Sequence, residues 1–268
     1  MHSYRLVLRF ELRKALRSRL TWIAVALPVL LTVISAWMAE VTRHARSAES
    51  TIEGIDSAFL AFSRGASNGF VLGGVLLLVY ASMIVANEGT LQTFKTIMLR
   101  AHPRSSWILA KFSLLMLLAL GILVGVVGSA LLAGAFFADF GAIAEEGYVI
   151  FEADFMRRAS WQAVALTIPP LLALAAFGLM ISTLTDHTGI ASAGCVGAYI
   201  FLEATKGSLG EPRIFLFNTF MPSLIDTSYF QALRGFANGM SDTGWEPGMF
   251  WYAVLTPLGS AFVFLAIA

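Results

Sequence analysis

Six long apolar runs constrain this chain more than any other feature of its sequence. A bilayer core about 30 Å thick is crossed by roughly 20 apolar residues in a helix. Only 13% of the 268 residues are charged, and most of these runs contain no Asp, Glu, Lys, Arg or His. The predicted spans are 20–39, 70–87, 107–136, 161–184, 189–204 and 249–268. We therefore predict an all-α membrane protein with six transmembrane helices, in which 1–268 form a single transmembrane domain.

Basic residues are distributed unevenly between the two sides of this topology. With the N-terminus inside, segments 1–19, 88–111 and 185–188 face the cytoplasm and hold ten of the 18 basic residues but only three of the 17 acidic ones. Cytoplasmic loops typically carry such an excess of Lys and Arg. We expect a multi-pass protein of the plasma (inner) membrane with a cytoplasmic N-terminus. Residues 20–39 are expected to remain as a span rather than to be cleaved as a signal peptide.

The predicted spans offer no set of side chains for catalysis or ion coupling. Proton- or ion-driven carriers usually need ionisable groups inside the membrane, whereas Glu203 lies only at the edge of the fifth span. The sequence has no catalytic motif of an intramembrane enzyme and no G-x-x-x-x-G-K-[ST] phosphate loop. We predict no catalytic residue, no bound cofactor and no metal ligand, and we interpret Cys195 as a packing residue. No dense basic run is present to bind nucleic acid.

Two segments on the cytoplasmic side are predicted to form helices at the membrane surface. Residues 1–19 form a basic interfacial helix, which either anchors the chain or cradles a cytoplasmic partner. After the second span, Gly89 permits a change of direction, and 88–106 then form a short amphipathic coupling helix that passes a push from a soluble motor into the membrane. Its apolar residues recur on one helical face at Leu91, Phe94 and Met98.

The outer segment 205–248 is too apolar for a solvated loop, and its Gly and Pro residues exclude another uninterrupted span. We expect two short helices, at 215–221 and 223–237. They either rest on the outer surface or fold back against the fifth and sixth spans as re-entrant helices. In the second case they form an outer gate whose aromatic residues are Phe217, Phe220 and Phe230.

Three further patterns carry expectations about packing and loops. Pro169-Pro170 lies in the middle of the fourth span and predicts a kink or break. The pattern Gly121-x-x-x-Gly125 predicts close approach of a neighbouring helix. The carboxylates of the outer segment 137–160 suggest a solvated acidic loop more readily than a cation site, and the outer segment 40–69 is mixed in charge.

The exit of the second span resembles that of a known family, the permease subunits of type-2 ATP-binding-cassette (ABC) exporters. These commonly have an acidic residue before Gly-Thr-Leu, a short helix, a Pro-x-x-Ser-like element and a lysine that opens the third span. This chain has Glu88-Gly89-Thr90-Leu91, His102-Pro103-Arg104-Ser105-Ser106 and Lys111. The basic first helix and the six-span layout match as well. One departure is Asn87, which stands where the family usually has a second acidic residue.

The resemblance implies a transmembrane subunit of an ATP-driven exporter. Six helices per subunit would pair as a homo- or heterodimer around a central path, surrounded by membrane lipids, with short outer helices dipping back from the outer face. ATP would be bound by separate cytoplasmic ABC ATPase subunits. The predicted ATPase-coupling residues are Glu88, Gly89, Thr90, Leu91, Phe94 and Met98. A secondary carrier and a non-transporting membrane anchor or assembly factor are the alternatives. The apolar spans fit lipids, hydrophobic peptides or drugs as substrates, or mechanical action on other proteins.

Overall fold

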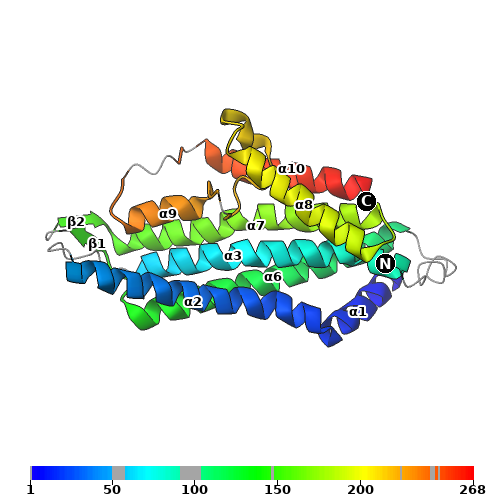
Figure 1. Ribbon diagram of the computed structural model, residues 1–268, viewed down its shortest axis with the longest axis horizontal. Coiled ribbons are helices and arrows are strands. Elements are labelled where there is room, and N and C mark those ends of the chain that lie inside the picture. The colour runs from blue at the N-terminus through cyan, green and yellow to red at the C-terminus, as the bar shows by residue number, and fades with distance from the viewer. Residues whose placement is uncertain are drawn as a thin grey trace.

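The computed structural model is a bundle of long helices that run side by side along its longest axis (Figure 1). It describes residues 2–49, 58–90, 104–145, 148–223, 225–241, 245–246 and 248–268. The elements are α1 (His2–Arg17), α2 (Arg19–Glu49), α3 (Ala58–Met83), α4 (Ala86–Thr90), α6 (Arg104–Phe137), β1 (Ile143–Glu145), β2 (Tyr148–Phe151), α7 (Ala153–Thr183), α8 (Thr188–Lys206), the 3-10 helix η1 (Glu211–Phe215), α9 (Tyr229–Ala237) and α10 (Met249–Ile267).

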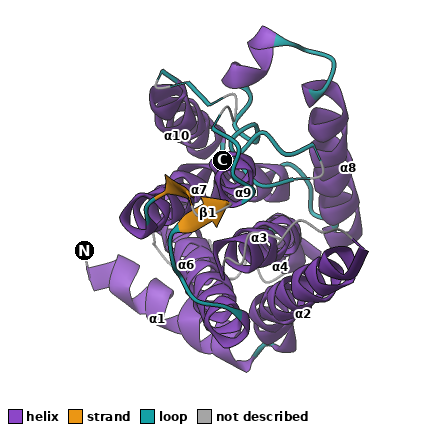
Figure 2. Cartoon of the chain, turned by 90° about the vertical axis from the view of Figure 1, so that its left-hand side faces the viewer, coloured by secondary structure: helices purple, strands orange, loops and turns teal. Residues whose placement is uncertain are grey.

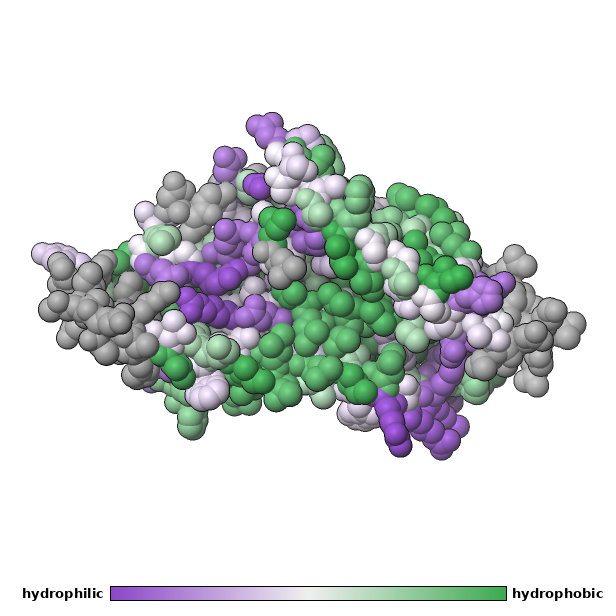
Figure 3. Space-filling model, viewed as in Figure 1, coloured by the Kyte–Doolittle hydropathy of each residue, from purple (hydrophilic) through white to green (hydrophobic). Residues whose placement is uncertain are grey.

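Five stretches of helix in the described part of the chain are long and apolar enough to cross a membrane. They are Arg19–Thr42, Ala58–Thr90, Ser105–Phe137, Ala153–Thr183 and Met249–Ile267. Helix α8, the fifth predicted span, is present but is not among them, because its 19 residues are mostly small or polar. Apolar side chains cover the middle of the surface and polar ones gather toward both ends (Figure 3), which suits a belt of hydrocarbon around the bundle.

Several helices are longer than the apolar runs that predicted them. Helix α3 begins at Ala58 rather than at residue 70, and α7 begins at Ala153 rather than at 161. An apolar run marks only the part of a helix inside hydrocarbon, whereas backbone hydrogen bonding can continue into the polar interface. The outer segments 40–69 and 137–160 are therefore partly helical. The latter also contains a two-stranded antiparallel hairpin, in which Ala144 pairs with Val149 and which an all-α prediction did not include.

Helix α3 lies at the centre of the bundle, with α2, α6, α7 and α8 around it (Figure 2). Glycines permit the closest of these contacts: a Cβ atom at Gly178 of α7 would lie 2.6 Å from the Cβ of Ala81 in α3. The close approach predicted at Gly125 is confirmed, because a Cβ there would lie 2.8 Å from Val29 Cγ2 of α2. Gly128, further along the same helix, has no described atom within 4 Å of such a position.

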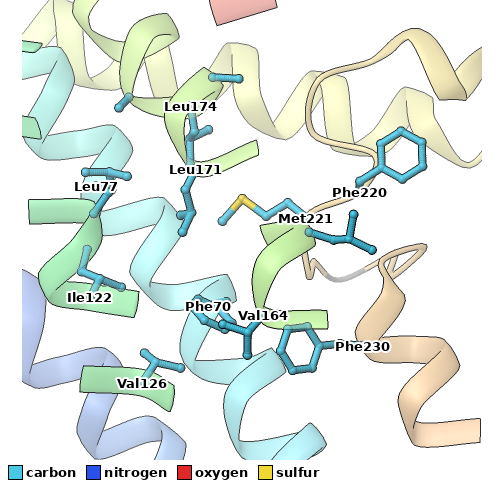
Figure 4. Close-up of a cluster of buried hydrophobic side chains, with 14 of the residues drawn as sticks. Phe70, Leu77, Ile122, Val126, Val164, Leu171, Leu174, Phe220, Met221 and Phe230 are labelled. Atoms are coloured by element: carbon cyan, nitrogen blue, oxygen red, sulfur yellow. The ribbon is translucent and has the colours of Figure 1, made fainter. Parts of the chain in front are cut away.

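The buried core joins α3, α6 and α7 to segment 205–248 (Figure 4). Its labelled members are Phe70, Leu77, Ile122, Val126, Val164, Leu171, Leu174, Phe220, Met221 and Phe230. Helix α7 continues through Pro169-Pro170, so of the predicted kink or break the break is wrong, while the kink stays a prediction. Both prolines are buried, and the helices packed against α7 hold it in place.

The helices of segment 205–248 lie at other positions than predicted. Residues 216–221 are turns rather than helix, and the 3-10 helix η1 comes before them, with Pro212 in its first turn. Helix α9 begins at Tyr229 rather than at 223, because Asp226 accepts a hydrogen bond from the Ser228 backbone N–H (2.9 Å) and holds a turn there. It ends at Ala237, followed by Gly239 at a φ of 77°, which confirms the predicted stop.

Candidate functional site

Helix α3 is interrupted at Ile84 and Val85, where the chain turns into the short helix α4. The backbone N–H groups of Val85 and Ala86 both donate to the Ser182 hydroxyl of α7, at 2.9 and 3.0 Å. A buried N–H without a partner would be costly, so this hydroxyl takes the place of the carbonyls that an uninterrupted helix supplies. The interruption is therefore held by a neighbouring helix.

Lys111 of α6 carries its ammonium group into the same region. Its Nζ lies 2.7 Å from Glu88 Oε1 and 3.1 Å from Glu11 Oε1, and it donates to the Ile84 carbonyl at 3.1 Å. The Lys111 side chain is fully buried, and both glutamates are 3% exposed. Three acceptors thus satisfy the three ammonium donors. The Trp107 ring, 4.7 Å from Nζ, adds a cation–π contact.

This ion cluster fastens α1 to the bundle. Glu11 belongs to α1, and so does Lys14, whose Nζ lies 3.2 Å from Glu88 Oε1. One turn or more away, the hydroxyls of Tyr4 and Ser113 lie 2.7 Å apart and join α1 to α6. The basic first helix is thus connected through charged groups to both α4 and α6. Removing one member of such a buried cluster leaves an uncompensated charge.

The residues after Glu88 contact the turn between α7 and α8. A Cβ at Gly89 would lie 2.9 Å from Asp186 Oδ1 and 3.1 Å from Asp186 Cα, so glycine is needed here for close approach. We expected Gly89 to permit a sharp change of chain direction. It lies inside helix α4 instead, so a change of direction does not explain why a glycine stands here. The Thr90 hydroxyl donates to the Asp186 carbonyl at 2.7 Å and lies 3.1 Å from the Thr188 hydroxyl.

The structure brings part of the predicted coupling set together. Glu88, Gly89 and Thr90 lie in one short helix that contacts α6, α1 and the α7–α8 turn. The Glu88 carboxylate is buried among this chain's own residues, so it contacts the bundle rather than the outside. The remaining predicted residues lie outside the described part of the chain: Leu91, Phe94 and Met98.

Three members of the ion cluster around Glu88 were missing from the predicted set: Glu11, Lys14 and Lys111. Glu11 is the one acidic residue in the basic segment 1–19, and Lys111 is a charged residue inside the predicted span 107–136. An ionisable side chain within an apolar span needs a partner, and this rule could have paired the two. Ser182 could not have been found in this way, because a hydroxyl at a helix end has many common uses.

The three predicted gate residues all lie within this chain's own core. Phe230 is fully buried, with its ring centroid 5.7 Å from that of Phe70, toward which it points in Figure 4. The ring of Phe217 lies 5.5 Å from that of Phe177 in α7. The ring of Phe220 lies 5.9 Å from that of Trp245. Phe230 and Phe217 thus hold segment 205–248 against α3 and α7, whereas Phe220 packs within the segment.

Polar contacts also fix the outer segment. The buried Lys206 at the end of α8 donates to the Asn218 carbonyl at 3.1 Å and to the Ser223 hydroxyl at 3.0 Å. Its Nζ lies 3.5 Å from Glu203 Oε1. Asp226 forms an ion pair with Arg234 of α9. The segment is therefore an ordered part of the bundle where the structure describes it.

The described residues contain no grouping of three or more His, Cys, Asp or Glu side chains that could hold a metal ion. In the acidic outer segment, the exposed Asp154 pairs with Arg157 at 3.4 Å, one turn along α7. Asp154 and Arg157 thus form a solvent-exposed ion pair at the start of a helix. The described structure is thus a bundle of helices with the buried ion cluster of Glu11, Lys14, Glu88 and Lys111 at one end.

Helices of this length and apolarity define a multi-pass membrane protein. A family model described as "ABC-2 family transporter protein" matches residues 7–184, about two thirds of the chain, and the chain belongs to this family. It is therefore an ABC transporter permease, a component of membrane transport that is not itself catalytic. The match runs from α1 to the end of α7 and includes the whole ion cluster. A comparison with curated proteins gave no match.

Proposed function

We propose that this chain is the transmembrane subunit of an ATP-driven exporter, coupled to a separate cytoplasmic ATPase through the region that begins at Glu88. The observation that carries this proposal is the ion cluster of Glu11, Lys14, Glu88 and Lys111. It joins α1, α4 and α6 at one end of the bundle, and residues 91–103 connect α4 to α6 in the sequence. A force applied to those residues is thus delivered to α1, α4 and α6 together.

In this proposal Glu88 transmits movement rather than touching the ATPase. Its carboxylate is 3% exposed and bonded to Lys111, which leaves contact with the partner to the apolar residues Phe94 and Met98. Thr90 extends the transmission to a second route, because its bonds reach the α7–α8 turn. Movement of the coupling region then shifts both hairpins of spans that end on this side.

The proposed topology places α1, α4 and the α7–α8 turn on the cytoplasmic side of the plasma membrane. The charge bias of the sequence supports this orientation. The hairpin β1–β2 and α9 lie at the opposite end of the bundle (Figure 1), which would face outward. Helix α8 is proposed as the sixth membrane-crossing helix, because it packs against α3 and its 19 residues rise about 28 Å, close to the thickness of a hydrocarbon core.

We also propose a paired permease with an outer gate. Helix α8 exposes glycines with open space beside them, since no described atom lies within 4 Å of a Cβ built at Gly194 or Gly197. Small residues of this kind allow a second helix to approach closely. A second permease subunit would complete the path there. The segment 205–248 would close the path as one packed unit. Because Phe217, Phe220 and Phe230 are buried, their rings would anchor this unit rather than line the path.

The proposal is tested by purifying the tagged chain in mild detergent from the cells that naturally produce it. An ABC ATPase subunit should co-purify. Phe94→Ala should reduce the amount retained, because loss of a buried aromatic contact costs about 3–5 kcal/mol. Phe136→Ala is the matched control, since this ring is exposed near the other end of α6.

The alternatives predict different results from the same preparation. A chain that moves substrate across vesicles without any ATPase is a secondary carrier. A chain that retains no ATPase and moves nothing is an anchor or assembly factor. Normal ATPase retention and turnover with Phe94→Ala would show that residues 91–103 are not the coupling element.

A further inference from the structure

An apolar groove lies between α1, α6 and α7, with a volume of about 460 Å³. Viewed down the bundle, α1 stands away from α7 beside α6 (Figure 2). Leu8 closes the groove on the α1 side, and Ile168 and Leu172 close it on the α7 side. Its floor follows α6 from Ser113 to Leu123, and the Ser113 hydroxyl is its one polar side-chain group. That hydroxyl is already bonded to Tyr4 at the α1 end.

The dimensions of the groove fit one leaflet of a bilayer. The ten residue steps from Ser113 to Leu123 rise about 15 Å. Half of a hydrocarbon core about 30 Å thick is also about 15 Å. A groove of this length, lined almost entirely by apolar side chains, suits one acyl chain that lies along α6.

One end of the groove is basic and the other is apolar. On α1, Arg5 lies three residues before Leu8, so the two side chains are neighbours on the helix surface. Arg5, Arg9 and Arg13 form a row at four-residue spacing, and all three are exposed. Like charges at this spacing destabilise a helix unless anions neutralise them. At the other end, Leu123 and Ile168 lie near the middle of the candidate spans Ser105–Phe137 and Ala153–Thr183.

Helix α1 also has the surface of an element that lies in the membrane interface. Leu6, Phe10 and Leu16 are 52%, 65% and 60% exposed, although they are large and apolar. In water this exposure would be costly, whereas the boundary between headgroups and acyl chains accommodates it. Tyr4, at the mouth of the groove, is of the residue type that gathers at this boundary. The basic end of the groove is thus at headgroup level.

We propose that the groove is a binding site for one anionic phospholipid. An acyl chain lies along α6 from Ser113 to Leu123, and the headgroup phosphate meets Arg5 and Arg9 of α1. The lipid belongs to the cytoplasmic leaflet, an assignment that rests on the orientation proposed above. The lipid then fills the space between α1 and the bundle beside the ion cluster, so the position of α1 depends on lipid charge as well as on Glu11 and Lys14.

The test uses the purified chain in phosphatidylcholine nanodiscs that contain a small fraction of a photoreactive lipid. The probe carries a diazirine in its acyl chain and has either a phosphatidylglycerol or a phosphatidylcholine headgroup. Crosslinked peptides are mapped by mass spectrometry. The phosphatidylglycerol probe should label 113–123 and 168–172 more strongly than the exposed apolar surface around Leu132 or Phe262. No ATPase is needed, so failure here is distinct from failure of the proposed function.

Two pairs of variants separate the acyl site from the headgroup site. Leu120→Trp fills the groove and should reduce labelling severalfold, while Leu132→Trp, at a 75% exposed position further along α6, should not. Arg5→Gln should reduce labelling by phosphatidylglycerol about fivefold toward the phosphatidylcholine level. Arg17→Gln, in the last turn of α1, is its control.

Even labelling of all lipid-facing peptides in the unmodified chain would overturn the proposal, whether or not any variant folds. Equal labelling by both headgroups would overturn the part that assigns Arg5. If a cysteine at Leu120 forms crosslinks to a second copy in place of lipid labelling, the groove is a protein interface and the proposal is wrong.

Discussion

The Nζ atom of Lys111 lies 2.7 Å from Oε1 of Glu88, and both side chains are buried. The two residues are 23 positions apart and belong to different helices. Because Lys111 also meets Glu11 of α1, this contact makes the end of the bundle a single charged unit.

Lys111→Met should destabilise the protein strongly. The variant leaves the carboxylates of Glu11 and Glu88 buried without their shared cation, and breaking a buried pair in this way costs about 3–5 kcal/mol. Glu88→Gln should cost less, because Lys111 keeps Glu11 as its partner. Thermal unfolding in detergent measures both. Arg157→Gln is the control, since it removes an exposed ion pair worth about 0–1 kcal/mol. Equal melting temperatures for Lys111→Met and Arg157→Gln would contradict the assigned role of the cluster.

Gly178→Ala should loosen the contact between α3 and α7. The new methyl group would lie 2.6 Å from the Cβ of Ala81, an atom that moves only with its backbone, and overpacking of this kind costs about 1–3 kcal/mol. Gly128→Ala is the matched control. No described atom lies within 4 Å of its added methyl, and alanine favours helix by about 1 kcal/mol. The melting temperature should therefore fall with Gly178→Ala and rise with Gly128→Ala; a fall with Gly128→Ala alone would contradict the packing described here.

Phe230→Ala should release the outer segment from the bundle. This ring is fully buried against α3, and its loss costs about 3–5 kcal/mol. Amide hydrogen exchange in 207–241 should become faster, while exchange in α6 stays slow. Phe215→Ala removes a ring that is 68% exposed and should leave exchange unchanged. Uniformly slow exchange in both variants would mean that this ring does not anchor the segment.

Single cysteines should report the topology. In a variant whose buried Cys195 is replaced, cysteines at Ala144 and Ser241 should react with a membrane-impermeant thiol reagent on intact cells. Both positions are exposed near the end of the bundle that carries β1–β2 and α9. A cysteine at Thr96 should react only after the cells are opened. The reverse pattern would place the N-terminus outside and would remove the proposed ATPase contact.

Prediction from the sequence succeeded where one physical preference dominates. Long apolar runs indicated α6 and α10 with ends close to those observed and the start of α2 to within one residue, because hydrocarbon demands an apolar helix, whereas α2 continues ten residues past its predicted end. It was less accurate at the interfaces, where α3 and α7 continue past their apolar runs. The helix expected at 215–221 was placed wrongly, because its aromatic residues suit buried turns as well as helices.

The candidate site was predictable only in part. Glu88, Gly89 and Thr90 stood out through a motif, but the motif did not indicate that the carboxylate is internal. That fact depends on Lys111 and Glu11, and on the long-range packing that brings α1 beside α6. The Ser182 contact depends on an interruption of α3 that the sequence pattern does not mark.

Helix α7 is hydrogen-bonded at two points to the elements that the proposed function assigns to the coupling region and the outer gate. Ser182 accepts hydrogen bonds from Val85 and from Ala86 at the start of α4, and Gln162 accepts one from the Tyr229 hydroxyl of α9 at 3.1 Å. Twenty residues of uninterrupted helix separate these two points by about 30 Å. If α7 tilts as a rod in the proposed transport cycle, about 5° around its midpoint moves the two points by about 1 Å in opposite directions. A displacement at one end of the bundle would then reach the other through α7.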